Sequence, residues 1–163
     1  MKNFSSLESY LESRGCAFER DAGAKAIHFD MEGENARWRC VACQPDALNW
    51  ALVSRLPLRA AAARRGACAE LCTRINWNLA VGHFDLNFSD GELRFTTLIP
   101  VVEQDRRSAE TLRWLFSAHR VLMDRFVPLF ARVLFAGEEP SDALADEPGD
   151  NDEHNPLPRF SLN

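Results

Sequence analysis

The clearest pattern in the chain lies in residues 71–98, where a helical repeat of apolar residues gives way to strict alternation. Apolar residues first recur every four positions, at Leu71, Ile75 and Leu79, which is the spacing of one helical face. After Gly82, apolar and polar residues alternate from His83 through Phe84 to Phe88 and again from Leu93 to Thr97, the period of a half-buried strand. Asp90-Gly91 between them is a hairpin-turn signal. The stretch predicts a helix end followed by a β-hairpin.

The residues before this stretch predict one helix and three strands. Phe4, Leu7, Tyr10 and Leu11 share one helical face, so a helix is expected over residues 5–13, ended by Gly15. Strands are expected over residues 26–31, 36–43 and 47–56, separated by turns. Connections this short favour an antiparallel three-stranded meander, because parallel pairing requires longer crossovers.

Two prolines shape the predicted helices. Pro57 is expected to close the third strand and open a helix over residues 58–80, since proline is tolerated at a first helical position. A last helix is expected to begin after Ser108 as N-cap and to end at Gly137. Pro128 lies inside this helix and predicts a kink or a split.

Charge divides the chain in two. From Gly137 onward there are eight acidic residues and one basic residue, a net charge of −7, whereas the preceding residues hold 18 basic and 16 acidic residues. Residues 138–163 lack hydrophobic periodicity and are predicted to form a disordered acidic tail behind a single α+β domain of residues 1–137. Deleting such a tail is expected to leave stability nearly unchanged.

These numbers also restrict the partners. The nearly neutral body gives little support to nucleic-acid binding, which needs a basic surface. The N-terminus has no apolar signal region, and no apolar stretch is long enough to span a membrane. We therefore expect a cytoplasmic protein that binds neither nucleic acid nor membrane.

Five cysteines raise the question of zinc. Cys40-x2-Cys43 and Cys68-x3-Cys72 could together supply four thiolates. However, the first pair lies on a predicted strand, where an odd offset places side chains on opposite faces. The second pair shares a helical face with Leu71 and is explained as small core residues. A structural zinc site is therefore the alternative hypothesis, and no cofactor or metal ligand is predicted.

No catalytic motif occurs among the known nucleophile, phosphate-loop, zinc-protease or dinucleotide patterns. Histidines 28, 83, 119 and 154 are scattered, and each is interpreted as a core or surface residue without a local partner. The prediction is a protein that is not an enzyme, with a dispersed catalytic site as a further alternative.

Arginine and tryptophan offer two surface features. Arg59, Arg64, Arg65 and Arg74 are interpreted as a solvated helix face rather than a basic patch. Three of the four tryptophans, Trp38, Trp50 and Trp114, are predicted to lie in the core. Trp77 is offset from the apolar stripe, so it is predicted to be exposed or to lie in an interface.

With these elements in order, the chain resembles the YbjN family, whose members are described as bacterial sensory transduction regulators with a fold similar to type III secretion chaperones. The resemblance covers residues 4–144 and rests on these segments: Trp50-x2-Val53, Leu56-Pro57, Ile75-Asn76, Leu79 to Phe84, Asp90-Gly91, Arg94-Phe95, Phe126 to Leu129, Val133-Leu134 and Gly137. Asn76, Gly82, Phe84 and Gly91 form its structural signature. Asn76 is expected to make hydrogen bonds at a helix end, and Gly82 to meet a backbone requirement.

The predicted fold is α+β: an antiparallel sheet, made of the three-stranded meander plus the hairpin, packed with three helices on one face. The resemblance implies a homodimer. The predicted function is that of a non-enzymatic, chaperone-like or regulatory protein that binds an unknown protein partner on an exposed apolar surface.

Overall fold

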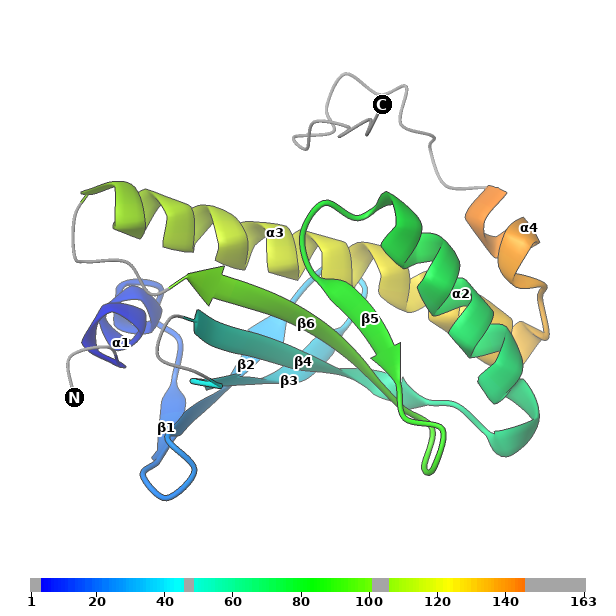
Figure 1. The fold of residues 1–163 in the computed structure, drawn as a ribbon, viewed down its shortest axis with the longest axis horizontal. Helices are drawn as coiled ribbons and strands as arrows, with labels where there is room; N and C mark the ends of the chain where they lie inside the picture. The colour runs from blue at the N-terminus through cyan, green and yellow to red at the C-terminus, as the bar shows by residue number, and fades with distance from the viewer. Residues whose placement is uncertain (1–3, 46–48, 101–105, 146–163) are drawn as a thin grey trace.

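The computed structural model describes residues 4–45, 49–100 and 106–145. These residues form two layers, an antiparallel sheet and a set of helices on one of its faces (Figure 1). The strands are β1 (Phe18–Asp21), β2 (Ala26–Glu32), β3 (Arg37–Cys43), β4 (Asn49–Arg59), β5 (His83–Leu86) and β6 (Glu92–Pro100). The helices are α1 (Phe4–Ser13), α2 (Arg65–Asn78), α3 (Arg106–Ala131) and α4 (Pro140–Ala145).

The strands follow the order β1-β2-β3-β4-β6-β5, and all neighbours are antiparallel. Helix α3 lies along the sheet, and α2 packs beside β5 at one end (Figure 1). Helix α1 approaches the opposite end, where Tyr10 packs 4.8 Å from the ring of Phe116 of α3. The helices therefore cover one face of the sheet, which we call the covered face.

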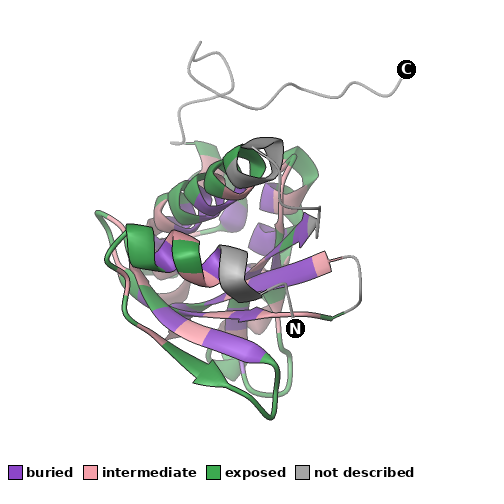
Figure 2. Cartoon of the chain, turned by 90° about the vertical axis from the view of Figure 1, so that its left-hand side faces the viewer, coloured by how far each residue is buried: buried purple, intermediate pink, exposed green. Residues whose placement is uncertain are grey.

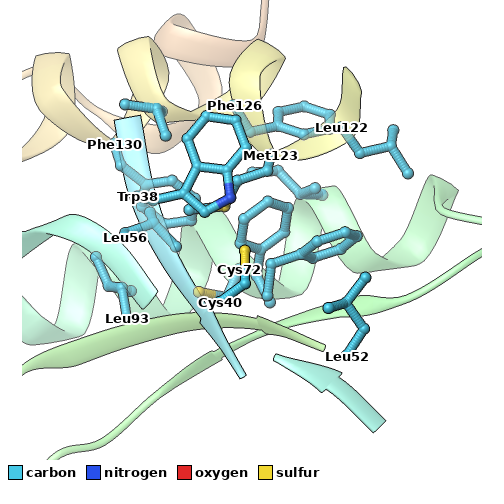
Figure 3. Close-up of a cluster of buried hydrophobic side chains, with 14 of the residues drawn as sticks. Trp38, Cys40, Leu52, Leu56, Cys72, Leu93, Leu122, Met123, Phe126 and Phe130 are labelled. Atoms are coloured by element: carbon cyan, nitrogen blue, oxygen red, sulfur yellow. The ribbon is translucent and has the colours of Figure 1, made fainter. Parts of the chain in front are cut away.

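The core lies between the covered face and the helices. Along each long strand alternate side chains point inward, as in β4, where Trp50, Leu52 and Leu56 are buried. The buried residues appear as alternating segments along the strands in Figure 2. Figure 3 shows Trp38 and Cys40 from β3 in one cluster with Phe126 and Phe130 from α3. Because the helices lie against one face of the sheet only, each helix needs one apolar side to complete this core.

The α+β class and the single antiparallel sheet agree with the prediction, but the number of elements does not. Strand β1 was not predicted, because Phe18-Glu19-Arg20-Asp21 contains one apolar residue and no alternation. It forms by pairing with β2, with Phe18 opposite Phe29. The described residues also contain four α-helices rather than three.

The prediction that Pro57 ends a strand and opens a helix was wrong. Strand β4 continues through Pro57 to Arg59, and α2 begins only at Arg65, after a 3₁₀ turn over Ala62–Arg64. The pairing of β4 with β6 is irregular between Arg55 and Arg59. Proline has no N–H for a sheet ladder, so it is tolerated inside a strand at such a bulge.

The predicted start of the last helix was also wrong. Helix α3 begins at Arg106, so Ser108 lies within it rather than at its N-cap. Of the two effects predicted for Pro128, a split does not occur, because the helix runs to Ala131 and continues as a π-helical segment, Arg132–Ala136. Gly137 ends this segment, as predicted, and adopts the left-handed conformation (φ 72°).

Residues 138–145 do not belong to a disordered tail. They form a turn and α4, in which Pro140 and Ala143 are buried against α2 and the π-helical segment. The sequence signal was weak because only three apolar residues, Ala143, Leu144 and Ala145, follow Pro140 in this acidic stretch. The remainder of the predicted tail, residues 146–163, lies outside the described residues.

Candidate functional site

The predicted signature residues meet where α2, β5 and β6 pack together. Phe84 is buried in β5, and its backbone N–H donates to Asn76 Oδ1 over 2.7 Å. In return, Asn76 Nδ2 donates to the carbonyl of Phe84 over 2.9 Å. The carboxamide of Asn76 thus satisfies the two backbone groups on the outer side of an edge strand, as a neighbouring strand would. Asn76 fastens the end of α2 to the edge of the sheet.

The two signature glycines lie beside this joint in backbone conformations that disfavour other residues. Gly82 has φ +73°, and a Cβ there would lie 2.6 Å from the ring of Phe95. Gly91 has φ +77°, and a Cβ there would lie 2.0 Å from the carbonyl oxygen of Ala60. Gly91 also accepts a hydrogen bond from the N–H of Ala60 (2.8 Å). Both positions need glycine for conformation and for space.

The hairpin turn itself is longer than the sequence indicates. Strand β5 ends at Leu86, and residues 87–91 connect it to β6. Phe88, placed on the predicted strand by alternation, is 59% exposed in this loop. Trp77 is the residue after Asn76 and is 88% exposed. The exposure of Trp77 agrees with the prediction. Trp114 was predicted to lie in the core, but it is 42% exposed.

A buried polar chain crosses the centre of the core. His119 of α3 lies with Nε2 2.7 Å from Ser54 Oγ and with Nδ1 2.9 Å from Thr97 Oγ1. Ser54 Oγ is in turn 3.1 Å from Cys40 Sγ. These four residues come from α3, β4, β6 and β3, and none is more than 1% exposed. His119 therefore links the middle of α3 to the neighbouring strands β4 and β6.

The arrangement of Ser54, His119 and Thr97 resembles a nucleophile, a base and an orienting group. Complete burial prevents a substrate from reaching it. Burial also lowers the pKa of His119 to about 3 and raises the pKa of Cys40 to about 12, so neither group is charged near neutrality. These hydrogen-bonded side chains hold α3 against the sheet, in agreement with the interpretation of His119 as a core histidine.

The cysteines do not form the zinc site considered from the sequence. Cys40 points into the core while Cys43, on the same strand, is half-buried on the opposite face. Cys68 and Cys72 are buried on α2, and all five cysteines are free thiols. Among the residues that the structure describes, no three or more His, Cys, Asp or Glu side chains are placed to hold a metal ion.

The arginines near α2 are not a common patch. Arg59 belongs to β4 and pairs with Asp90 (3.5 Å), while Arg74 pairs with Glu70 one helical turn away (2.7 Å). Arg65 donates to the carbonyl of Phe88 (2.8 Å). Arg64 donates to the carbonyls of Val133 and Glu138, both over 2.9 Å. Two of the four therefore tie neighbouring segments together rather than forming a solvated face.

The face of the sheet away from the helices, which we call the open face, carries an apolar strip. In the described part of the chain no helix lies over it (Figures 1 and 2). Register places Val41 opposite Val53, Val53 opposite Thr96, and Ala51 between Cys43 and Leu98. We call these residues the open-face strip: Val41, Cys43, Ala51, Val53, Thr96 and Leu98. Leu98 is 54% exposed, and Val41, Cys43, Val53 and Thr96 are half-buried.

Charged residues border the open-face strip in pairs. Arg39 pairs with Glu19 (3.0 Å), and Arg55 pairs with Glu92 (3.7 Å). Arg94, opposite Arg55 in the register, also pairs with Glu92. The border therefore holds both signs of charge around an apolar centre, which is the composition of many protein-binding surfaces.

Comparison with protein families assigns the chain to a family. The family model described as "YbjN: Putative bacterial sensory transduction regulator" matches residues 3–132. The chain belongs to the YbjN family. No curated protein and no solved structure matches the chain. The predicted likeness to type III secretion chaperones therefore stays a prediction.

The YbjN match includes the whole sheet, α2 and α3, but it ends at Arg132 rather than at residue 144, the limit expected from the resemblance. Helix α4 therefore lies beyond the matched part. All four signature residues and Trp77 fall inside it. Among the described residues, no helix is both long and apolar enough to cross a membrane.

Several residues that hold the domain together were missed at the sequence level. Asp124 of α3 accepts the backbone N–H groups of Glu34 (2.9 Å) and Asn35 (2.8 Å) in the β2–β3 turn. A Cβ at Gly33 would lie 2.0 Å from Asp124 Oδ1. An acidic residue among the apolar residues of the second half of α3 was the available signal, but its partners lie about ninety positions away. Ser54 and Thr97 were missed for the same reason.

Proposed function

We propose that this member of the YbjN family is a non-enzymatic regulatory protein of the bacterial cytoplasm that acts by binding polypeptides, as an adaptor or chaperone does. The observation that carries the proposal is the open-face strip. An antiparallel sheet with one solvated face normally presents polar side chains there. Here three neighbouring strands present valine, cysteine and leucine around the buried Ala51 instead.

The buried hydrogen-bonded residues around His119 are a second argument for a binding role. The only nucleophile-and-base pair noted in the described core, Ser54 and His119, is closed to solvent. A binding role requires exposed complementary surface rather than converging reactive groups. The open face supplies such a surface, bordered by paired charges of both signs.

We further propose that, when no partner polypeptide is bound, a second copy of the chain covers the open-face strip, giving a homodimer that the partner separates. Two identical faces can pack about a twofold axis because each patch then contacts its own copy. The border supports this packing, since Arg39, Arg55 and Arg94 are each paired with Glu19 or Glu92 and the faces do not present a block of unpaired like charge to each other.

The test is solution mass by light scattering on wild type, Leu98→Glu and Val121→Glu. Leu98 and Val121 are similarly exposed, at 54% and 51%, but Val121 lies on α3, away from the open face. Wild type and Val121→Glu are expected at twice the chain mass of 18.4 kDa, and Leu98→Glu at the mass of one chain. A monomeric wild type, or equal behaviour of the two variants, would remove the proposed dimer.

Polypeptide binding is tested separately by placing a photo-crosslinking amino acid at position 98 or 121 in bacterial cells. Crosslinks from position 98 to a defined polypeptide other than the chain itself, and none from position 121, support the function. Absence of crosslinks from position 98 in cells that contain folded protein contradicts it.

A further inference from the structure

Helix α4 occupies a groove, which we call its seat, between α2 of the matched YbjN domain and the π-helical segment that follows α3. Its Ala143 is fully buried, Pro140 is buried and Leu144 is half-buried, although the helix has only six residues. These side chains pack against α2 and the π-helical segment. In Figure 1, α4 stands beside α2 at the end of the molecule where α3 finishes. A helix this short is not stable in isolation, so the seat holds it in place.

Two arginines provide the polar part of the seat. The guanidinium of Arg132 forms two bonds with the carboxylate of Glu138, over 2.7 and 2.5 Å, and also donates to the carbonyl of Ala143 (3.4 Å). Arg64 donates to the carbonyls of Val133 and Glu138. Bidentate arginine–carboxylate pairs are among the stronger and more directional hydrogen bonds in proteins. The seat therefore selects a glutamate just before a short helix.

The seat and its occupant come from different parts of the chain. Arg64, α2 and Arg132 lie within residues 3–132, the part matched by the family, whereas the rest of the π-helical segment, Glu138 and α4 lie beyond it. The matched part thus supplies one wall of the groove and both arginines, and the residues after it supply the other wall and show what kind of segment fits the groove.

We propose that the groove between α2 and the π-helical segment, which we call the α4 groove, is a peptide-binding site. Its ligand is a short helix preceded by a glutamate that pairs with Arg132, with a small residue at the position of Ala143. Helix α4 is the ligand supplied by the chain itself, and a partner protein with such a segment replaces it. This site is separate from the open-face strip and does not depend on the function proposed for that strip.

Competition between α4 and an added peptide tests the proposal in the full-length chain. The probe is a fluorescein-labelled peptide with the sequence of residues 137–146. Ala143→Asp is expected to displace α4 because the fully buried position of Ala143 has no room for a larger, charged side chain, and Ser141→Asp is the matched control, since Ser141 is exposed on the same helix. The Ala143→Asp protein is expected to bind the probe at least about tenfold more tightly than wild type and Ser141→Asp, whose own α4 competes at a high effective concentration.

Peptide variants test the chemistry of recognition. A probe carrying Glu138→Gln loses one charged partner of Arg132 and is expected to bind more weakly, and a probe carrying Ala143→Asp is expected not to bind. Equal binding of the probe to wild type and to folded Ala143→Asp protein, or equal binding of the Glu138→Gln probe, overturns the proposal. Far-UV circular dichroism establishes folding, and full-length Glu138→Gln, which loosens α4 without burying a charge, replaces Ala143→Asp if that protein does not fold. Leu98→Glu should leave probe binding unchanged, which separates this result from failure of the open-face proposal.

Discussion

Strand β4 turns Leu52 and Ser54 toward the helices and Val53 and Arg55 toward the open face. The inward pair is fully buried, and Ser54 is paired with His119. The outward pair is half-buried and exposed, with its apolar member in the open-face strip. The same backbone therefore serves two surfaces with different tasks. The covered face binds the helices of its own chain, whereas the open face still has apolar surface that those helices do not cover.

The largest contrast is expected between neighbouring positions of β4. Leu52→Ala should lower the free energy of unfolding by about 2–5 kcal/mol, because it leaves a cavity in the core. Val53→Ala should cost about 1 kcal/mol or less in the monomer, because its side chain is only half-buried. Denaturant titration of both variants at low protein concentration provides the measurement. If Val53→Ala is as harmful as Leu52→Ala, the open face is covered within the chain.

The next largest loss of stability is expected at the edge strand β5, where Asn76 holds the end of α2. Asn76→Leu should lower the free energy of unfolding by about 1–3 kcal/mol, because the N–H and C=O of Phe84 lose their partners. Asn78→Leu, at an exposed position near the end of the same helix, is the control and should change little. Thermal unfolding followed by circular dichroism compares them. Similar changes in both variants would show that the two hydrogen bonds to Phe84 contribute little to stability.

Acid should lower the free energy of unfolding, because His119 is buried without charge between α3 and the covered face. Its pKa is about 3 in the folded chain, against 6.5 for an exposed histidine, so the unfolded chain binds the proton first. The stabilisation is complete above pH 6.5 and is lost as pH falls from 6.5 toward 3, with a slope of up to about 1.4 kcal/mol per pH unit.

Denaturant titrations at pH 7 and pH 5.5 measure this slope. In His119→Gln the slope should be smaller than in wild type. The two proteins share all their other titratable groups, so the difference between their slopes reports His119. An unchanged slope in His119→Gln would mean that His119 is accessible to protons in the folded chain.

Chemical labelling of β3 compares the two faces with the smallest perturbation, because this strand carries Cys40 on the covered face and Cys43 on the open face. Iodoacetamide should modify Cys43 in the folded protein but not Cys40, whose thiol is fully buried with its pKa raised to about 12. Mass spectrometry of peptides locates the label. Protection of Cys43 in wild type but not in Leu98→Glu would show that a second copy covers the open face. Protection in both would contradict the description of that face.

Much of the fold could be predicted because its signals are local. The alternation in β2, β3 and β6 and the four-residue repeat in α2 each report the surroundings of a single element. Gly82 and Gly91 were recognised because positive φ leaves a mark on residue choice wherever it occurs. The exposure of Trp77 followed from its offset from one helical stripe.

The predictions that were wrong depended on partners distant in the sequence. Strand β1 has a charged sequence and exists because β2 pairs with it. Pro57 remains in a strand because a bulge in the pairing with β6 removes the need for its N–H. Helix α4 forms because Arg64 and Arg132 hold it, although its own sequence is acidic and short.

The sequence by itself therefore determined the α+β class, most of the helices and strands, the hairpin with its glycines and the family. Only the tertiary structure decided which polar groups meet: Asn76 with Phe84, His119 with Ser54 and Thr97, and Arg132 with Glu138. It also decided which face of the sheet the helices leave open. The physical reason is that periodicity records whether a residue is buried, whereas hydrogen bonds and docking surfaces depend on which distant segment does the burying.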